Sequence, residues 1–256
     1  MNDQQSRIEQ ALRDVISRYP ADQQPRQIED IPRQAFHVGL VMSAKGSSAR
    51  VCDIGGGTGT FSVGCAAVGM KATLIDDFRD SINIRQGTNV LDVHRSYGVD
   101  VISRDVVEQG IEFPPESFDM VTTFDSMEHW HHSPKKLFAQ VMRCLAPGGV
   151  FLLCGPNSVN LRKRVMTPLG RNKWSHMNDW YEQERFRGHV REPDLDDFRY
   201  IARDMGLVDC KTFGRNWLGY VGRSGWRQTL IRAIDAPLRW FPSLCADIYI
   251  MGRKSG

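Results

Sequence analysis

Three histidines stand within four residues in the stretch MEHWHHSP. They are His129, His131 and His132, and imidazole is the side chain whose ordinary pKa lies nearest neutrality. One of them could therefore act as a catalytic general base toward a substrate hydroxyl. Alternatively, His129 is a buried, hydrogen-bonded loop residue and the other two are solvated. The carboxylates that would complete a metal site are not visible at ligand spacing, so we predict no metal.

The stretch VCDIGGGTGTFS, residues 51–62, holds four glycines in positions 55–59, directly after a short apolar run. Glycine adopts positive φ values and lets a ligand approach the main chain without interference from a Cβ. A strand that turns into a helix there also presents N–H groups at the helix N-terminus, which favour negative ligand groups. A tight turn without a ligand is the alternative, but four glycines exceed what turning requires.

Two carboxylates follow at the ends of the next two apolar runs. Asp76 ends the run in KATLIDD, where a carboxylate can accept hydrogen bonds from both hydroxyls of a ribose. Asp105 ends VDVISRD, where it is placed to accept from an adenine amino group. Each acid alone could instead cap a helix or lie in a solvated loop. Together with the glycines they predict a nucleoside-containing ligand. A dinucleotide-binding loop with a degenerate glycine motif is the alternative.

The elements that must position these residues are apolar runs alternating with helical patterns. Such alternation predicts an α/β fold, a doubly wound, Rossmann-like parallel sheet with right-handed crossovers and helices on both faces. Ligands of such sheets lie at the carboxyl ends of the strands. The expected strands are 50–54, 72–75, 99–103, 117–124, 150–154, 208–213 and 246–253.

Segments outside this alternation define the predicted organisation. Residues 1–47 form an N-terminal helical segment, in which a Pro/Gln stretch over 20–34 precedes a short helix. The main domain is expected over 48–256 and carries two inserts, 155–197 and 215–243.

The first insert follows the fifth expected strand and is basic. Between residues 162 and 191 there are eight Lys and Arg but three Asp and Glu. Arginine binds phosphate or carboxylate through paired hydrogen bonds, so Arg187, His189 and Arg191 of FRGHVRE are candidates for substrate binding. A merely solvated charged face is the alternative. An acceptor-covering lid is the expected role of this insert.

The second insert contains a helical pattern in which Trp226, Leu230 and Ile234 share one face. Such a face suits a lid or a dimer contact. A peripheral membrane contact through residues 223–241 is a weaker alternative.

With these motifs the chain resembles the class I S-adenosylmethionine-dependent methyltransferases, close to the methyltransferase type 11 group. The motifs that match in order are VCDIGGGTG, Asp76, the RD pair ending at Asp105, SFDMVTTFDSMEHW and CLAPGGVFLL, over residues 48–156. The resemblance implies a seven-stranded sheet whose last strand is antiparallel. It implies S-adenosylmethionine as cofactor. The (D/N)PP(Y/F) pattern of enzymes that methylate base amino groups is absent, which disfavours that reaction.

The resemblance also implies roles for single residues. Gly55, Gly57 and Gly59 face the methionine part of the cofactor, and Asp53 supports its ammonium group. Phe124 and Asp125 line the pocket near the sulfonium. Asp76 is the preferred ribose contact and Asp105 the acid on the adenine side. Asp77 follows Asp76 directly and is the other candidate for the ribose.

Composition is that of an ordinary globular protein: 41% hydrophobic residues, 25% charged residues and a net charge of +3. The six cysteines form no CxxC pair and are expected to be reduced. The N-terminus has no apolar signal region and no run reaches membrane-spanning length, so we expect a cytoplasmic protein.

These observations predict a methyltransferase that O-methylates a small or glycan-like, possibly anionic acceptor. The alternatives are a nucleic-acid methyltransferase, an NAD-dependent oxidoreductase and a non-catalytic cofactor-binding partner protein. The charge gives no clear nucleic-acid signal by itself, and the oligomeric state is left open.

Overall fold

The computed structural model describes residues 3–79, 89–171, 175–182, 184, 186–217 and 225–256. Within them the chain forms a seven-stranded sheet in the order β3-β2-β1-β4-β5-β7-β6. The strands are β1 (Arg50–Ile54), β2 (Lys71–Asp76), β3 (Asp100–Ser103), β4 (Phe118–Phe124), β5 (Leu145–Pro156), β6 (Val208–Arg215) and β7 (Asp247–Arg253).

The first five strands are parallel, and β7 runs antiparallel to both β5 and β6. The structure therefore confirms the predicted α/β fold and the antiparallel last strand. The strand order reverses at β1 and β4, whose carboxyl ends adjoin. Such a switch point is where ligands of open α/β sheets bind.

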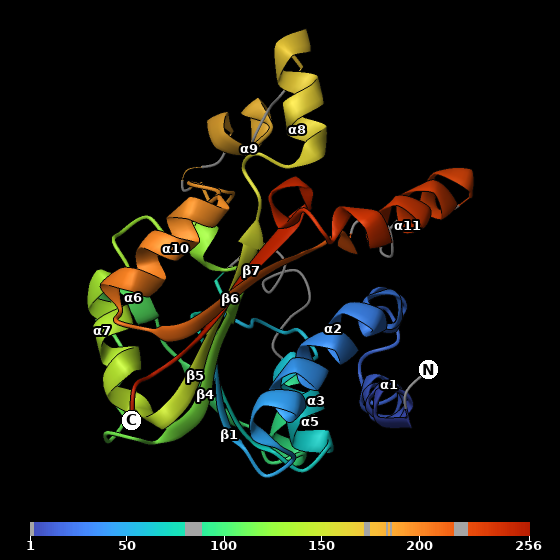
Figure 1. Cartoon of the computed structure of the whole chain (residues 1–256). Coiled ribbons are helices and arrows are strands. Elements are labelled where there is room, and N and C mark those ends of the chain that lie inside the picture. The colour runs from blue at the N-terminus through green and yellow to red at the C-terminus, as the bar shows by residue number, and fades with distance from the viewer. Residues whose placement is uncertain (1–2, 80–88, 172–174, 183, 185, 218–224) are drawn as a thin grey trace.

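Helices cover both faces of the sheet (Figure 1). One face carries α1 (Asp3–Ile16), α2 (Gln24–Lys45), α3 (Phe61–Ala67) and α5 (Val90–Ser96). The other carries α6 (Val106–Gln109), α7 (Lys135–Cys144) and α10 (Leu195–Asp204). Each face has its own cluster of buried apolar side chains packed against the strands.

Three further helices lie away from these layers. Figure 1 shows α8 (Leu161–Met166) and α9 (Met177–Tyr181) beyond the end of β5, above the sheet, while α11 (Trp226–Leu238) extends to the side. These helices belong to the two predicted inserts. No helix of the described residues is both long and apolar enough to cross a membrane.

The N-terminal helices differ from the expected pattern. The Pro/Gln stretch was predicted to interrupt the helical segment, but α2 runs unbroken through it from Gln24 to Lys45. Pro25 lies in the first turn, where the N–H that proline lacks has no intrahelical partner in any case. Pro32 lies inside the helix, and packing of the buried neighbours Ile31, Ala35 and Val38 compensates for the lost hydrogen bond.

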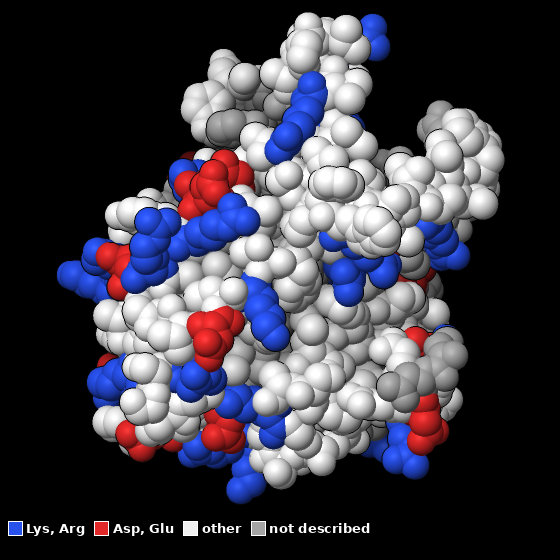
Figure 2. Space-filling view, viewed as in Figure 1, with Lys and Arg blue, Asp and Glu red and all other residues white. Residues whose placement is uncertain are grey.

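Charged side chains are distributed rather than gathered on the face shown in Figure 2. Lys and Arg are interspersed there with Asp and Glu, particularly over the α7 and α10 side. The small net charge of +3 is therefore not concentrated in one basic surface on this face.

The second insert was expected to present an apolar helical face, and α11 does so. Trp226, Leu230 and Ile234 are all exposed, as are Trp240 and Phe241 after the helix. Residues 223 and 224 of the region 223–241 lie outside the described residues. The membrane and dimer contacts expected of this region stay predictions.

The first helix packs as part of the main core. Leu12 of α1 is fully buried, and its side chain lies against Gly64 of α3, where an added Cβ would come within 2.7 Å of Leu12 Cδ2. We expect Leu12→Ala to lower the free energy of unfolding by about 2–5 kcal/mol, because it opens a cavity between α1 and α3. Urea denaturation measures this. The control is Arg13→Ala, which changes an exposed neighbour. Equal effects of the two substitutions on the free energy of unfolding would show that α1 does not pack as part of the core.

Candidate active site

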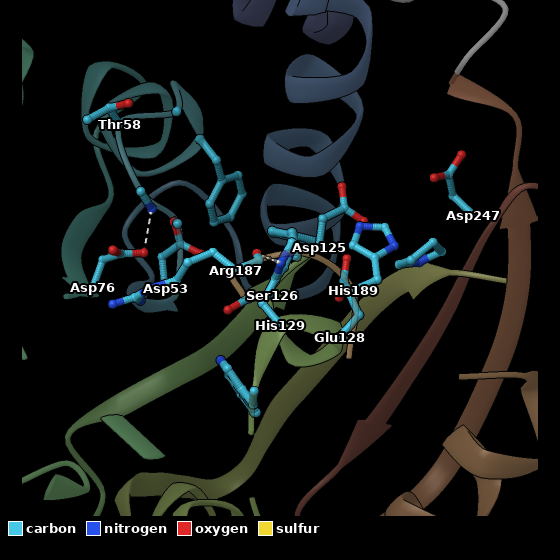
Figure 3. Close-up of a pocket in the computed structure, with 18 of the residues that line it drawn as sticks. Asp53, Thr58, Asp76, Asp125, Ser126, Glu128, His129, Arg187, His189 and Asp247 are labelled. Atoms are coloured by element: carbon cyan, nitrogen blue, oxygen red, sulfur yellow. Dashed lines mark hydrogen bonds between the residues drawn. The ribbon is translucent and has the colours of Figure 1, made fainter. Parts of the chain in front are cut away.

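A cavity of about 730 Å³ opens at the carboxyl ends of β1, β2, β3 and β4 (Figure 3). Its lining includes residues from α2, from the loops after these strands and from the segment 186–192. The volume lies within the range of small-molecule and cofactor pockets. The sheet therefore forms its pocket where the strand order predicts it.

The glycine stretch forms one wall of this cavity. Gly55 and Gly57 have φ values of 74° and 55°, in the left-handed region that glycine adopts without strain. A Cβ on Gly55 would collide with the Ser126 hydroxyl, and one on Gly56 would collide with the Asp53 carboxylate. Glycine is needed there both for the bend and for the close approach of neighbouring loops.

Asp76 lies directly against this bend. Its Oδ2 accepts a hydrogen bond of 3.0 Å from the Gly57 N–H, and its Oδ1 accepts one of 2.6 Å from the Phe78 N–H. Asp77 also lines the cavity, but its carboxylate faces the Arg187 guanidinium at 3.3 Å. The two neighbouring acids are thus held by different partners, which separates them as candidates for the ribose.

Asp105 lines the cavity from the end of β3 and also caps α6. Its Oδ1 accepts hydrogen bonds of 3.1 Å from the N–H groups of Val107 and Glu108. The helix cap was the structural alternative for this residue. The cap and a place in the cavity are compatible, because Oδ1 makes both capping bonds.

Asp53 lies beneath the glycine bend and is buried, with 2% of its surface exposed. It accepts hydrogen bonds from the Ser62 hydroxyl at 2.6 Å and the Thr122 hydroxyl at 3.1 Å. Burial is the main cause that raises the pKa of Asp53 to about 7, with a further contribution from the charge of Asp76 and an opposing one from the two hydroxyls.

Phe124 ends β4, and both Phe124 and the next residue, Asp125, line the cavity. The Phe124 ring stacks on His37 of α2, with ring centroids 4.0 Å apart and planes inclined by 4°. Asp125 has a φ of 48° and forms an ion pair of 2.8 Å with Arg33, which also pairs with Asp30.

The α2 residues of the cavity were missed in the sequence. They are Arg26, Gln27, Asp30, Arg33, Gln34 and His37. A signal for them exists, because these polar residues recur every three or four positions and so share one face of a helix. The prediction of a broken segment over 20–34 hid that periodicity.

The predicted catalytic histidines all line the cavity but differ in their surroundings. His129 is half-buried and its Nδ1 lies 2.8 Å from the Arg187 carbonyl oxygen. His131 Nε2 lies 3.0 Å from the Phe186 carbonyl oxygen. His132 is exposed, as His131 is, and its Nε2 lies 3.9 Å from Glu108 Oε1.

The predicted substrate-binding segment packs against the same loop. The main-chain carbonyl of Glu128 accepts hydrogen bonds from the N–H groups of Val190 and Arg191, at 2.7 and 3.2 Å. Arg187 and His189 line the cavity. Arg191 is not among the lining residues, and its guanidinium forms a 2.9 Å ion pair with Asp197. Arg185 of the same basic insert lies outside the described residues.

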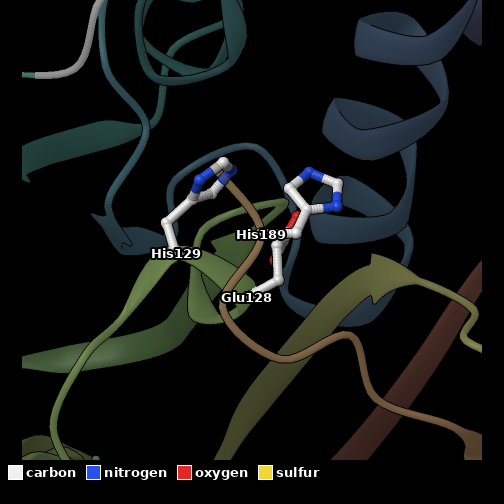
Figure 4. A group of neighbouring side chains, drawn as sticks. All are labelled: Glu128, His129 and His189. Carbon is white, nitrogen blue, oxygen red and sulfur yellow. The ribbon is translucent and has the colours of Figure 1, made fainter. Parts of the chain in front are cut away.

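Three side chains of this region together form a possible metal-binding group: Glu128, His129 and His189 (Figure 4). One nitrogen or oxygen atom of each lies within 4.8 Å of the others. The expectation of no metal depended on the absence of a carboxylate at ligand spacing. Folding supplies Glu128 as that carboxylate, because His189 comes to it from sixty residues further along the chain.

Comparisons with known proteins agree on the type of domain. A family model described as a methyltransferase domain matches residues 5–211. No match was found among curated proteins.

Solved structures share the fold at low sequence identity. An S-adenosylmethionine-dependent methyltransferase from Archaeoglobus fulgidus is 18% identical with a TM-score of 0.56, over 87% of this chain and 93% of that one. One from Mesorhizobium loti is 15% identical with a TM-score of 0.56, over 88% and 97%. Phosphoethanolamine N-methyltransferase 2 of Haemonchus contortus, in complex with S-adenosyl-L-methionine, is 18% identical with a TM-score of 0.53, over 86% and 52%.

The raised pKa of Asp53 makes stability depend on pH. The folded chain holds this proton up to about pH 7, but the unfolded chain holds it only to about pH 4. The stabilising contribution of the neutral form is therefore complete below the unfolded pKa and is lost as the pH rises to about 7. Relative to Asp53→Asn, we expect the wild-type free energy of unfolding to fall by on the order of 4 kcal/mol over that range.

Urea denaturation at a series of pH values measures this difference. Asp196→Asn changes a carboxylate whose side chain is 87% exposed and is the matched control. A difference between wild type and Asp53→Asn that stays constant with pH would contradict the burial of a protonated Asp53.

Proposed function

The chain belongs to the methyltransferase-domain family. From this premise we propose that its methyl donor is S-adenosylmethionine and that it O-methylates a small or glycan-like acceptor that carries negative charge. The observation that carries the proposal is the single cavity that holds the glycine bend, Asp76, the loop histidines and Arg187 together. The donor-side residues and the acceptor-side residues enter it from different elements. Nucleic acid as the acceptor stays an untested alternative.

The described residues fit the donor. When bound, S-adenosylmethionine supplies a methyl group that its sulfonium activates for in-line displacement. The bare main chain at Gly55, Gly57 and Gly59 leaves room for its methionine part, and Asp53 below the bend supports the ammonium group. Asp76 accepts hydrogen bonds from the ribose, because its oxygens already face the cavity wall at the bend.

The remaining donor contacts come from the neighbouring strands. Asp105 lies on the adenine side, at the end of β3. Phe124 and Asp125 lie at the end of β4, next to the reacting methyl group. Arg33 holds Asp125 through an ion pair, so that this carboxylate keeps its position at the centre of the cavity.

The acceptor lies between the loop after β4 and the segment 186–192. His129 borders it there, because the Arg187 carbonyl takes Nδ1 and leaves Nε2 for the acceptor side. His131 and His132 frame the mouth of the cavity, where His131 is held by a main-chain carbonyl and His132 is exposed. Positioning of an acceptor oxygen against the methyl group is the main catalytic task.

Positive charge at the mouth supports an anionic acceptor. Arg162, Lys163 and Arg187 all line the cavity. Lys163 is paired with Glu192 and Arg187 with Asp77, so the charge of both is partly neutralised within the protein. Arg162 is exposed, and no acid of the described residues pairs with it. It is therefore the best candidate to meet an acceptor phosphate or carboxylate.

N-methylation of an amine is the second candidate. Asp247 and Glu128 contribute carboxyl groups to the same cavity. Burial, and secondly the charge of Asp125, raise the pKa of Asp247 to about 7. Such carboxylates attract a cationic amine. The basic residues at the mouth of the cavity therefore favour an anionic acceptor, and the carboxyl groups on its floor favour an amine.

The donor assignment is tested by comparing two adjacent acids. Asp76→Asn should weaken S-adenosylmethionine binding by about tenfold or more, because it removes an acceptor of ribose hydrogen bonds. Asp77→Asn should change it by less than about threefold, because Asp77 faces Arg187. Isothermal titration calorimetry measures both. Equal affinities of wild type and Asp76→Asn would reject the assignment.

The acceptor is tested with labelled S-adenosylmethionine and a panel of hydroxy acids, sugar phosphates, neutral sugars and amines. We expect labelled methyl ethers from the hydroxyl groups, or labelled methyl esters from the carboxylates, of the anionic acceptors. Arg162→Gln should raise the acceptor KM by about fivefold or more without changing donor affinity, whereas Arg164→Gln, which does not line the cavity, should not. Label on amines alone would favour N-methylation instead.

A further inference from the structure

Two imidazoles and one carboxyl group face each other on the acceptor side of the cavity (Figure 4). His129 and Glu128 come from the short 3-10 helix Met127–His129 after β4, and His189 comes from the segment before α10. The two imidazole rings are nearly perpendicular, with centroids 4.9 Å apart. All three residues line the cavity.

Each imidazole is held through the same ring nitrogen. His129 Nδ1 lies 2.8 Å from the Arg187 carbonyl oxygen, and His189 Nδ1 lies 2.8 Å from Glu192 Oε1. A carbonyl and a carboxylate only accept hydrogen bonds, so Nδ1 carries the hydrogen in both rings. Nε2 of each neutral ring then keeps a free lone pair. Metal-binding histidines are oriented in this way by a carboxylate or carbonyl at the other nitrogen.

The Glu128 side chain supplies the independent observation. The residue is 1% exposed, and its Oε2 is buried without a hydrogen-bond partner among the described residues. A buried carboxyl oxygen without a partner is costly, and proteins retain such groups where a ligand or ion completes them. Its main-chain carbonyl is meanwhile bonded to the His189 segment, so that side chain and segment keep their relative position.

We propose that Glu128, His129 and His189 bind one divalent transition-metal ion. Two imidazole nitrogens and one carboxylate oxygen are donors that suit Zn²⁺, Fe²⁺, Co²⁺ and Mn²⁺ rather than Ca²⁺. Metal–ligand bonds of about 2.1 Å in a tetrahedral site separate the ligand atoms by roughly 3.4 Å. The widest pair of ligand atoms, at 4.8 Å or less, therefore closes by about 1.4 Å or less on binding.

Glu192 and Lys163 support the site. Glu192 is 9% exposed, it accepts from His189, and its other oxygen pairs with Lys163. Lys163 pairs with one oxygen of Glu192, and the other oxygen accepts from His189 Nδ1, which leaves His189 Nε2 available to an ion. Glu192 is thus a positioning residue for the ion.

Three protein ligands leave coordination positions open toward the cavity. If the proposed O-methylation is correct, an acceptor hydroxyl occupies one of them, and the ion lowers the pKa of that hydroxyl. The C–O bond then forms as the C–S bond breaks, the electron pair of that bond stays on sulfur, and the hydroxyl proton leaves to solvent. This role depends on the proposed function, but the binding of the ion does not.

The test titrates chelator-treated protein with Co²⁺ alone and follows its visible d–d absorption, with Zn²⁺ competition and elemental analysis for stoichiometry. We expect one equivalent to bind. Glu128→Gln and His189→Ala should each weaken binding by about a hundredfold or more, and Glu192→Gln by about tenfold to a hundredfold. His132→Ala changes an exposed histidine of the same loop and should leave metal affinity unchanged.

Circular dichroism shows which variants fold, and if Glu128→Gln does not, His189→Ala decides. Binding of no stoichiometric ion, or equal binding by all folded variants, overturns the site. S-adenosylmethionine calorimetry on the same samples separates the two proposals. Donor binding without metal binding rejects only the ion, and metal binding without donor binding rejects only the donor site.

Discussion

The cavity depends on one main-chain junction between segments far apart in the sequence. The Glu128 carbonyl accepts hydrogen bonds from Val190 and Arg191, and the next residue, His129, binds the Arg187 carbonyl. These bonds join the loop after β4 to the insert after β5. The insert thereby becomes a wall of the pocket, and Arg187 and His189 line the cavity. Loops that carry function are positioned by such attachment to a rigid scaffold.

The donor side depends on a different constraint, the absence of side chains at the glycine bend after β1. Gly55 leaves room for Ser126, so the loops after β1 and β4 approach more closely than a larger residue would permit. Gly56 leaves room for the Asp53 side chain of β1. Asp76 then bonds the main chain of the same bend. Steric exclusion and one carboxylate thus create a surface of main chain at the switch point of the sheet.

The sequence predicted what is local and missed what depends on the path of the chain. Asp76 ends β2, Asp105 lies two residues after β3, and the glycines follow β1, so alternating apolar runs were enough to predict that they lie at one edge of the sheet. Glu128 had no visible partner, because His189 meets it only through the fold of the insert. The α2 residues were missed for another reason: the Pro/Gln stretch over 20–34 suggested a break, whereas tertiary packing outweighs the local cost of Pro32 inside the helix.

Carboxyl groups are buried on both sides of the pocket, and their burial disfavours the ionised form. Asp53 lies under the bend and Glu128 under the acceptor wall, with 2% and 1% of their surfaces exposed. Burying ionised carboxyl groups destabilises the folded chain unless cations or hydrogen bonds compensate. Arg33 does this for Asp125 within the protein. Two hydroxyl groups, of Ser62 and Thr122, do so for Asp53, whereas Glu128 Oε2 has no hydrogen-bond partner among the described residues. A cation that bound at Glu128 would therefore stabilise the folded chain.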